Sequence, residues 1–440
     1  MLPRRQFGGA GIVMPKLMKL LTAEIDSSSH GKITLGSVSD YEKSGGFNAL
    51  KKAAFMKPED TIAEVKKAKL LGRGGAAYPA GNKWEQLLEI PETPKYIVCN
   101  ADEGEPGTFK DRLIMEKLPY KLLEGIIIAG FVFRAKAGYI YVRGEYRKIQ
   151  KNLIAATENL KAAGYLGGNI LGTGFDFEIN VISGAGAYVC GENSALLNST
   201  EGRVGRPRIK PPHLAEVGLF LQPTLVNNVE SFANIPVILN MGGDAYLKAG
   251  HPDSGGTKLI CLSGHSQNSG VYEIPLGRVS LREAIYDPEL GGGIRDNKKL
   301  KFFHLGGQSG PIGSVDQLDT VYSYTDLRKA GLSVGSGAIV VMDESVSILE
   351  YLEGVTEFFI HESCGKCVPC REGNKQLLHF LKKLAVPNAA GAADLEALRR
   401  IIRTMTDASF CGLGQTAAAA LSSGWKYFKN EFEANVRAGA

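Results

Sequence analysis

The amino-acid sequence predicts an α/β protein in three parts: a layered α/β domain, a small α+β module and a helical C-terminal region. Helical periods alternate with short apolar runs from about residue 45, short β-rich runs with glycine tracts follow from Lys258, and helical periodicity dominates beyond Ser345. We therefore expect an N-terminal extension over 1–45, an α/β domain over 46–245, an α+β module over 246–340 and a helical domain over 341–440.

The elements of the α/β domain follow from periodicity and from Pro and Gly positions. Strands are predicted at Lys95–Cys99, Tyr139–Arg143 and Phe177–Ile182. Helices are predicted at Pro58–Leu71, at Asp111–Phe133 with an interruption near Pro119, at Glu145–Ala163 and from about Gly191. A helix over Val226–Leu239 is expected to close the domain at Gly242.

The α+β module has predicted strands at Leu259–Ser263 and Val271–Ile274 and a short helix near Ser280. In the helical domain an apolar stripe recurs at helical spacing, formed by Ile348, Leu349, Leu352, Val355 and Phe359. Because the cysteines of this domain fall between its helices, we expect a four-helix bundle that carries them.

The composition excludes some classes of function. The chain has 44% hydrophobic and 22% charged residues and a net charge of +5 without a long Lys/Arg block, so nucleic acid and anionic membranes are not favoured partners. The most apolar run, Gly125–Phe133, is too short to cross a bilayer. Arg4-Arg5 faintly resembles an export signal, but its apolar stretch ends at Pro15, and we expect a cytoplasmic protein without membrane insertion.

Four of the seven cysteines lie in the last quarter, as Cys364, Cys367, Cys370 and a distant Cys411. Three thiols at every third position, with a fourth from elsewhere, suit an iron–sulfur cluster. A structural zinc site more often has two separate Cys pairs, and a disulfide framework suits small secreted chains. The spacing therefore favours electron transfer.

Three segments have the composition of nucleotide-binding loops. Residues 72–84 are glycine-rich and contain Lys83, residues 100–108 place carboxylates after a strand, and residues 184–193 form a glycine turn before a helix. Taken alone, each is also compatible with an ordinary loop, a solvated acidic turn or a structural helix start.

These motifs resemble, in order and approximate spacing, the NADH-binding flavoprotein subunit of respiratory complex I and its relatives in NAD-linked hydrogenases and formate dehydrogenases. The matching segments are 72–75, 100–108, 184–188, 226–230 and 363–371. The resemblance implies a Rossmann-like domain for FMN and NAD(P)H, a ubiquitin-like middle module and a [4Fe-4S] cluster.

The resemblance also implies site residues. FMN would be held by Gly72, Gly74, Lys83, Asn100, Asp102, Glu103, Glu192, Asn227 and Asn228. The NAD(P)H pocket would be lined by Gly75, Ala76, Tyr78, Glu105, Tyr188, Asn193, Lys210 and His213. The cluster ligands would be Cys364, Cys367, Cys370 and Cys411.

Several positions depart from the family pattern: Ala77, Tyr78, Ala80, Asn193 and His213 replace an expected Gly, Phe, Thr, Glu and aromatic residue. Asn193 matters most, because a carboxylate there would repel the 2′-phosphate of NADP and a neutral amide would not. We therefore hypothesise that NADP(H) is accepted.

The implied partners are a [2Fe-2S] thioredoxin-like subunit and a larger iron–sulfur subunit of the complex I, hydrogenase or formate dehydrogenase type. Any membrane association would come through such partners. The alternative function is a non-catalytic iron–sulfur or zinc assembly subunit that has lost flavin.

Overall fold

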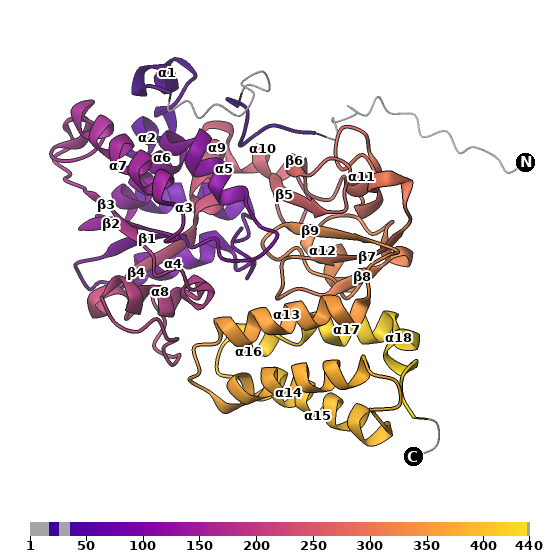
Figure 1. The fold of residues 1–440 in the computed structure, drawn as a ribbon. Coiled ribbons are helices and arrows are strands. Elements are labelled where there is room, and N and C mark those ends of the chain that lie inside the picture. The colour runs from indigo at the N-terminus through magenta and orange to yellow at the C-terminus, as the bar shows by residue number, and fades with distance from the viewer. Residues whose placement is uncertain (1–16, 26–35, 438–440) are drawn as a thin grey trace, which may run out of the picture.

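The computed structural model describes residues 17–25 and 36–437, so Arg4-Arg5 and most of the predicted N-terminal extension lie outside the described residues. Figure 1 shows an α/β domain, a second sheet with its own helices, and a helical C-terminal domain. The mixed α/β class predicted from the sequence is confirmed.

The first sheet has four parallel strands in the order β3-β2-β1-β4. Their bounds are β1 Tyr96–Ala101, β2 Ala137–Val142, β3 Ile179–Ser183 and β4 Thr224–Asn228. The helices of this domain are α1 Val38–Lys43, α2 Asn48–Ala53, α3 Pro58–Lys67, α4 Ala80–Glu89, α5 Lys110–Lys117, α6 Pro119–Phe133, α7 Arg147–Ala162, α8 Asn193–Thr200, α9 Val229–Met241 and α10 Gly243–Lys248.

Helix α6 forms the centre of this domain. Every one of its residues is buried, including Lys121 and Glu124, which explains why the rest of its sequence is apolar on all sides and does not form a polar face. It packs against α9 so closely that a Cβ on Gly125 would lie 2.0 Å from the carbonyl oxygen of Phe232. The break predicted near Pro119 is confirmed, because α5 ends at Lys117 and α6 begins at Pro119.

Two predictions for this domain are wrong in detail. Residues 226–228, predicted as the start of a helix, belong to strand β4, and α9 begins only at Val229. Helix α3 ends at Lys67 rather than Leu71, and Lys69 has a left-handed φ of 46°. The additional strand pairs with β1 so that Asn100 lies opposite Asn228.

The second sheet is mixed, in the order β6-β5-β9-β7-β8, with β5 and β9 parallel at its centre. Its elements are β5 Thr257–Gly264, β6 Gly270–Pro275, α11 Leu281–Tyr286, β7 Leu300–Leu305, β8 Ile312–Ser314, α12 Tyr324–Lys329 and β9 Ala338–Asp343. This compact α+β unit agrees with the ubiquitin-like module that the resemblance implies. The predicted boundary at residue 340 lies within β9.

The C-terminal domain is helical, as predicted. Its helices are α13 Ile348–Glu362, α14 Val368–Leu384, α15 Ala392–Ala408, α16 Gly412–Thr416, α17 Ala419–Tyr427 and α18 Lys429–Glu433. The predicted stripe residues from Ile348 to Phe359 are buried in its core. Within the described ranges, no helix has both the length and the apolar character needed to cross a bilayer.

Candidate functional site

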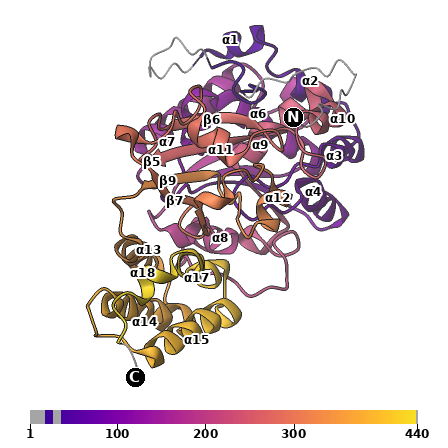
Figure 2. The same ribbon diagram turned by 90° about the vertical axis from the view of Figure 1, so that its right-hand side faces the viewer.

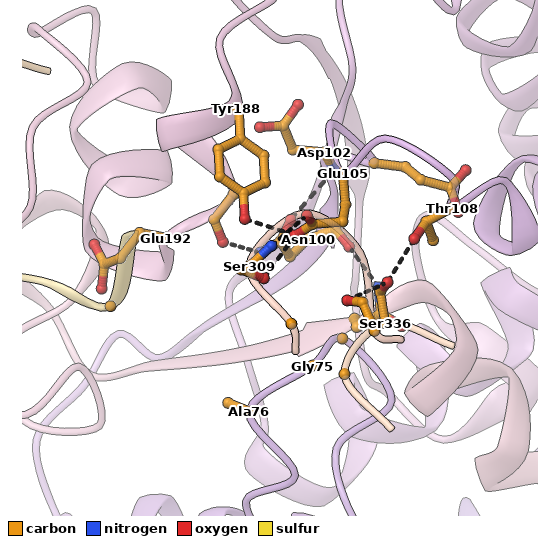
Figure 3. Close-up of a pocket in the computed structure, with 18 of the residues that line it drawn as sticks. Gly75, Ala76, Asn100, Asp102, Glu105, Thr108, Tyr188, Glu192, Ser309 and Ser336 are labelled. Carbon is orange, nitrogen blue, oxygen red and sulfur yellow. Dashed lines mark hydrogen bonds between the residues drawn. The ribbon is translucent and has the colours of Figure 1, made fainter. Parts of the chain in front are cut away.

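A cavity of about 460 Å³ lies at the carboxyl ends of the first sheet's strands (Figure 3). Ten of the predicted site residues line it: Gly74, Gly75, Ala76, Asn100, Asp102, Glu103, Glu105, Tyr188, Glu192 and Asn228. The second sheet's module adds Gly306, Ser309, Gly310, Ser333, Gly335 and Ser336, and the helical domain adds Gly412, Leu413 and Thr416. The cavity therefore has walls from all three parts of the chain.

The two asparagines meet because β1 and β4 are neighbours. Asn228 caps α9, since its Oδ1 accepts from the backbone N–H of Glu230 at 3.0 Å, and its Nδ2 donates to Asp111 Oδ2 at 2.7 Å. Asn100 Nδ2 donates to the carbonyl of Gly191 at 2.8 Å and to Asn193 Oδ1 at 3.1 Å. This network connects the edge of the sheet to the turn before α8.

The glycine loop forms one side of the cavity. A Cβ on Gly74 would lie 3.0 Å from Cβ of Asn228, and Gly75 has a φ of +126°, which favours a residue without a side chain. The loop is closed by a hydrogen bond from the backbone N–H of Gly72 to the carbonyl of Tyr78 at 2.9 Å. Main chain is thereby exposed to a planar or phosphorylated ligand.

Asp102 has an unsatisfied acceptor at the cavity. Its Oδ2 is buried and has no hydrogen-bond partner among the described residues, and burial raises the pKa of Asp102 to about 7. Since buried polar atoms are normally paired, this oxygen fits a ligand that donates a hydrogen bond, such as FMN with its ring N–H and ribityl hydroxyls.

The raised pKa of Asp102 predicts that the stability of the protein depends on pH. An unfolded aspartic acid releases its proton near pH 4, whereas the folded chain retains it up to about pH 7. For protein stripped of FMN but retaining its cluster, the free energy of unfolding should therefore fall as pH rises from about 4 to 7. Urea unfolding of wild type and Asp102→Asn should show a shallower slope in the variant, and parallel slopes would contradict this assignment.

Glu103 has a structural role beside its place in the cavity wall. Its carboxylate accepts hydrogen bonds from the backbone N–H groups of Asp111 at 2.7 Å and Arg112 at 2.9 Å, at the start of α5. Burial, with the charge of Asp111, raises its pKa to about 7. Glu103 therefore contributes to the pH slope that remains in Asp102→Asn.

A buried ionic network under the cavity was not predicted from the sequence. Lys110 Nζ lies 2.7 Å from Asp111 Oδ1 and 3.0 Å from Glu230 Oε2, and Lys258 Nζ lies 2.6 Å from Glu230 Oε2. Burial alone would lower the pKa of Lys110. The negative charges of Asp111, Glu230 and Glu103 outweigh this effect and raise the pKa of Lys110 above its usual range. The network connects the α/β domain to strand β5.

Glu105 joins the α/β domain to the second module. Its carboxylate accepts from the Tyr188 hydroxyl at 2.6 Å and from the Ser309 hydroxyl at 3.1 Å, and Figure 3 shows both side chains pointing toward it. Burial raises the pKa of Glu105. The backbone N–H of Tyr188 donates to Glu362 at 2.8 Å, next to the cysteine loop.

Lys83 and Lys210 place positive charge near this region. Burial, followed by the charge of Lys210, lowers the pKa of Lys83 to about 8, and its Nζ donates to the carbonyl of Val226 at 2.9 Å. Lys210 pairs with Glu192 at 2.8 Å. Within the part of the chain that the structure describes, Lys83 Nζ has a carbonyl but no carboxylate as its hydrogen-bond partner, and an anionic phosphate would stabilise its charge.

Seven predicted site residues do not line the cavity: Gly72, Tyr78, Lys83, Asn193, Lys210, His213 and Asn227. Tyr78 is 43% exposed, with its hydroxyl accepting from Gln86, and His213 is exposed in the loop before Glu216. Asn193 and Lys210 contact the wall residues Asn100 and Glu192.

The four predicted cluster ligands meet in one pocket. Cys367 stands at the N-cap of α14, where the helix dipole favours a thiolate, and Cys411 stands at the N-cap of the short helix α16. In the part of the chain that is described, no three His, Cys, Asp or Glu side chains are close enough to form a site for a single metal ion. Four soft donors around one pocket fit an iron–sulfur cluster.

The cysteine pocket and the main cavity share a wall. Val189 and Leu413 line both. Lys366, between two of the cysteines, donates to the carbonyl of Pro207 at 2.7 Å and lies 3.8 Å from the Phe410 ring centre. The cysteine loop is thus fixed against the α/β domain.

Comparisons with known proteins agree with this geometry. Residues 65–237 match the family model of the Nuo51 FMN-binding domain, and residues 350–435 match that of the NADH-ubiquinone oxidoreductase-F iron-sulfur binding region. The chain is 43% identical to the F subunit of the NADH-quinone oxidoreductase of Streptomyces coelicolor, covering 90% of this chain and 87% of that protein.

A hydrogenase subunit and a hydrogenase structure are also similar. The NADP-reducing hydrogenase subunit HndC of Solidesulfovibrio fructosivorans is 41% identical, over 92% of this chain and 82% of that one. A crystal structure of NAD+-reducing [NiFe]-hydrogenase in the H2-reduced state matches with a TM-score of 0.81 and 32% identity, covering 92% of this chain and 67% of the other. The chain therefore belongs to the family of NADH-quinone oxidoreductase F subunits and their hydrogenase relatives, the NADH dehydrogenase subunits that bind FMN and a [4Fe-4S] cluster within multi-subunit oxidoreductases.

Proposed function

We propose that this chain oxidises NAD(P)H in the main cavity and passes electrons singly through the cysteine pocket to partner subunits. The wall shared by the two sites, formed by Val189 and Leu413, is the observation that carries the proposal. Bound FMN would accept a hydride from the nicotinamide and release electrons one at a time. The protein's own residues bind and orient the reactants and exclude water.

The FMN side of the cavity is assigned to the ends of β1 and β4 and to the glycine loop. Gly74 leaves space, Asp102 offers the unpaired acceptor, and Asn100 and Asn228 fix the sheet edge. The proposed set is completed by Gly72, Lys83, Glu103, Glu192 and Asn227. Lys83 is the proposed phosphate partner.

The nucleotide side is assigned to the mouth of the glycine loop and to Glu105 with Tyr188. Glu105 is an acceptor suited to ribose hydroxyls. The proposed set also contains Gly75, Ala76, Tyr78, Asn193, Lys210 and His213. Tyr78 and His213 are exposed and would have to turn toward a bound nucleotide.

The proposed partners are a [2Fe-2S] thioredoxin-like subunit and a larger iron–sulfur subunit. Support comes from the relatives, which carry the names of subunits of quinone oxidoreductase and hydrogenase complexes. We propose a cytoplasmic location, with any attachment to a membrane made through those subunits.

Spectroscopy, metal analysis and activity assays of the anaerobically purified protein test this function. We expect a yellow flavin spectrum, iron with acid-labile sulfide, an EPR signal after dithionite, and reduction of ferricyanide by NADH or NADPH. Colourless protein without flavin would favour the alternative function as a non-catalytic assembly subunit. Zinc in place of iron would overturn the assignment of an iron–sulfur cluster.

Asn193→Glu should decrease the use of NADPH. The amide of Asn193 accepts a hydrogen bond from Asn100, and a carboxylate at this position would add a negative charge near the proposed 2′-phosphate. We expect kcat/KM for NADPH to fall on the order of tenfold, equivalent to about 1.4 kcal/mol, with NADH much less affected.

The neutral variant Asn193→Gln is the control, because it keeps the amide and adds no charge. A wild type that prefers NADH by several orders of magnitude, with the same preference in Asn193→Glu, would reject a role of Asn193 in nucleotide choice.

A further inference from the structure

Two side chains that can donate hydrogen bonds lie beside the sulfur of Cys370. The hydroxyl of Ser363 is 3.3 Å from Cys370 Sγ, and Nδ2 of Asn374 is 3.6 Å from the same atom. Cys370 is only 5% exposed, whereas the other three cysteines of the pocket are partly exposed. Water therefore has the least access to this sulfur, and hydrogen bonds to it come from the protein.

The two donors are brought together by the packing of α13 against α14 in the helical domain (Figure 2). Ser363 directly follows α13 as its C-cap, and Cys370 is the third residue of α14. Asn374 lies four residues after Cys370 in the same helix, and residues at this spacing share a helix face. The sulfur of Cys370 therefore lies between the end of one helix and the second turn of the next.

The hydroxyl of Ser363 is oriented as a donor to the sulfur. Its oxygen accepts a hydrogen bond from the backbone N–H of Gly365 at 3.3 Å, so its own hydrogen is left for Cys370. A cysteine that ligates iron is a thiolate and has no hydrogen to donate. In the cluster-bound protein the hydrogen bond must therefore run from Ser363 to the sulfur.

Asn374 is a polar residue in an otherwise apolar part of α14. It is fully buried, and the buried positions that follow it are Leu377, Leu381 and Leu384. Its Nδ2 also donates to the carbonyl of Cys370 at 2.9 Å, but its Oδ1 has no hydrogen-bond partner among the described residues. A buried amide with an unpaired oxygen is less favourable than a well-packed apolar side chain. The contact with the sulfur gives this amide a role that leucine could not fill.

Hydrogen bonds to a cysteine ligand affect the reduction potential of an iron–sulfur cluster. Reduction adds one electron without forming or breaking a bond, and part of the added negative charge falls on the sulfur ligands. A donor beside such a sulfur therefore stabilises the reduced state more than the oxidised state, and the potential rises. The effect is larger at a buried sulfur, because the local dielectric constant is lower than in water.

We propose that Ser363 and Asn374 act through the sulfur of Cys370 to raise the reduction potential of the cluster. Neither residue lines the main cavity, so this effect favours the transfer of electrons out of the flavin without changing nucleotide binding. The inference rests on the proposed function, because it requires that electrons pass through a cluster at the four cysteines.

A redox titration of the anaerobically purified holoprotein, followed by EPR, tests this proposal. In Ser363→Ala and in Asn374→Leu the equilibrium constant for reduction should fall about tenfold, which is a midpoint potential about 59 mV more negative for a one-electron couple. Ser363→Thr keeps the hydroxyl, so its midpoint potential should be close to that of wild type.

Thr356→Val is the matched control, because it removes a buried hydroxyl from the same domain. Thr356 is 3% exposed, its hydroxyl donates to the carbonyl of Leu352 at 2.8 Å, and it does not line the cysteine pocket. Its midpoint potential should equal that of wild type. The proposal would be overturned by midpoint potentials in Ser363→Ala and Asn374→Leu that equal the value in Thr356→Val.

Iron, acid-labile sulfide and flavin content separate a change in potential from a loss of the cluster. All three should be unchanged in the variants. If Asn374→Leu alone loses iron, the comparison of Ser363→Ala with Ser363→Thr decides the proposal. Loss of iron from both variants, with an unshifted potential in the clusters that remain, would give the two residues a purely structural role and reject the inference. Wild-type protein with neither iron nor an EPR signal would instead overturn the proposed function.

Discussion

Cys411→Ala is expected to abolish the [4Fe-4S] cluster while FMN stays bound. Cys411 stands before α16, far along the chain from the other three cysteines, and closes their pocket. Without its sulfur one iron would lose its protein ligand, and clusters of this type need four thiolates. Cys411 does not line the main cavity, so the flavin site keeps its walls.

Iron and sulfide content, the EPR signal after dithionite and flavin content measure this effect. NADH-dependent reduction of ferricyanide should remain, since this acceptor can take electrons from the flavin, while transfer to partner subunits should stop. Cys261→Ala is the control, because Cys261 is buried in β5 and lies outside the pocket. Full iron and sulfide in Cys411→Ala would remove Cys411 from the ligand set.

Above pH 7, where Asp102 is ionised, Asp102→Ala is expected to weaken FMN binding about 10- to 100-fold, because hydrogen bonds to charged groups contribute about 1.5–3 kcal/mol. The buried Oδ2 of Asp102 has no partner in residues 17–25 and 36–437, so a hydrogen-bond donor of the ligand is the group that would satisfy it. The Kd of FMN, measured by flavin fluorescence during reconstitution of the stripped protein, gives the effect directly.

Glu158→Ala is the matched control for Asp102→Ala. This substitution removes a carboxylate from the same domain, but the Glu158 side chain is 63% exposed on α7 and pairs only with Lys161 among the contacts described. An FMN Kd in Asp102→Ala that equals the value in Glu158→Ala would reject Asp102 as a flavin ligand.

The parts of the site that follow strand ends could be predicted from the sequence. Asn100 and Asp102 come directly after an apolar run, and the four cysteines have the spacing of a cluster motif. These signals are local, because the strand end and the spacing of Cys364, Cys367 and Cys370 each involve residues that are close together in the sequence. The structure brings ten of the predicted residues to one cavity for this reason.

Strand β4 was missed because its residues are ambiguous. Leu225 and Val226 form a short apolar run, Asn227 and Asn228 are poor strand formers, and the helical period of α9 begins at once at Val229. Pairing with β1 supplies the stabilisation that the local sequence lacks. Tertiary contacts therefore decided the element.

The buried ions could not be predicted from local patterns either. Lys110, Asp111 and Glu230 lie in first turns of helices, where charged residues are normally exposed. Their burial depends on Lys258, which approaches from the second sheet. Ser309 and Ser336 likewise reach the cavity only through packing between modules. A short sequence motif does not reveal such packing.

Because the walls of the main cavity come from three parts of the chain that each have a hydrophobic core of their own, a ligand that fills the cavity is a non-covalent cross-link between them. The free energy released on binding then adds to the work needed to pull any one core away from the other two. Cofactor loading and resistance to dissociation of the modules are therefore expected to rise together, so that the loaded subunit is also the form best suited to assembly.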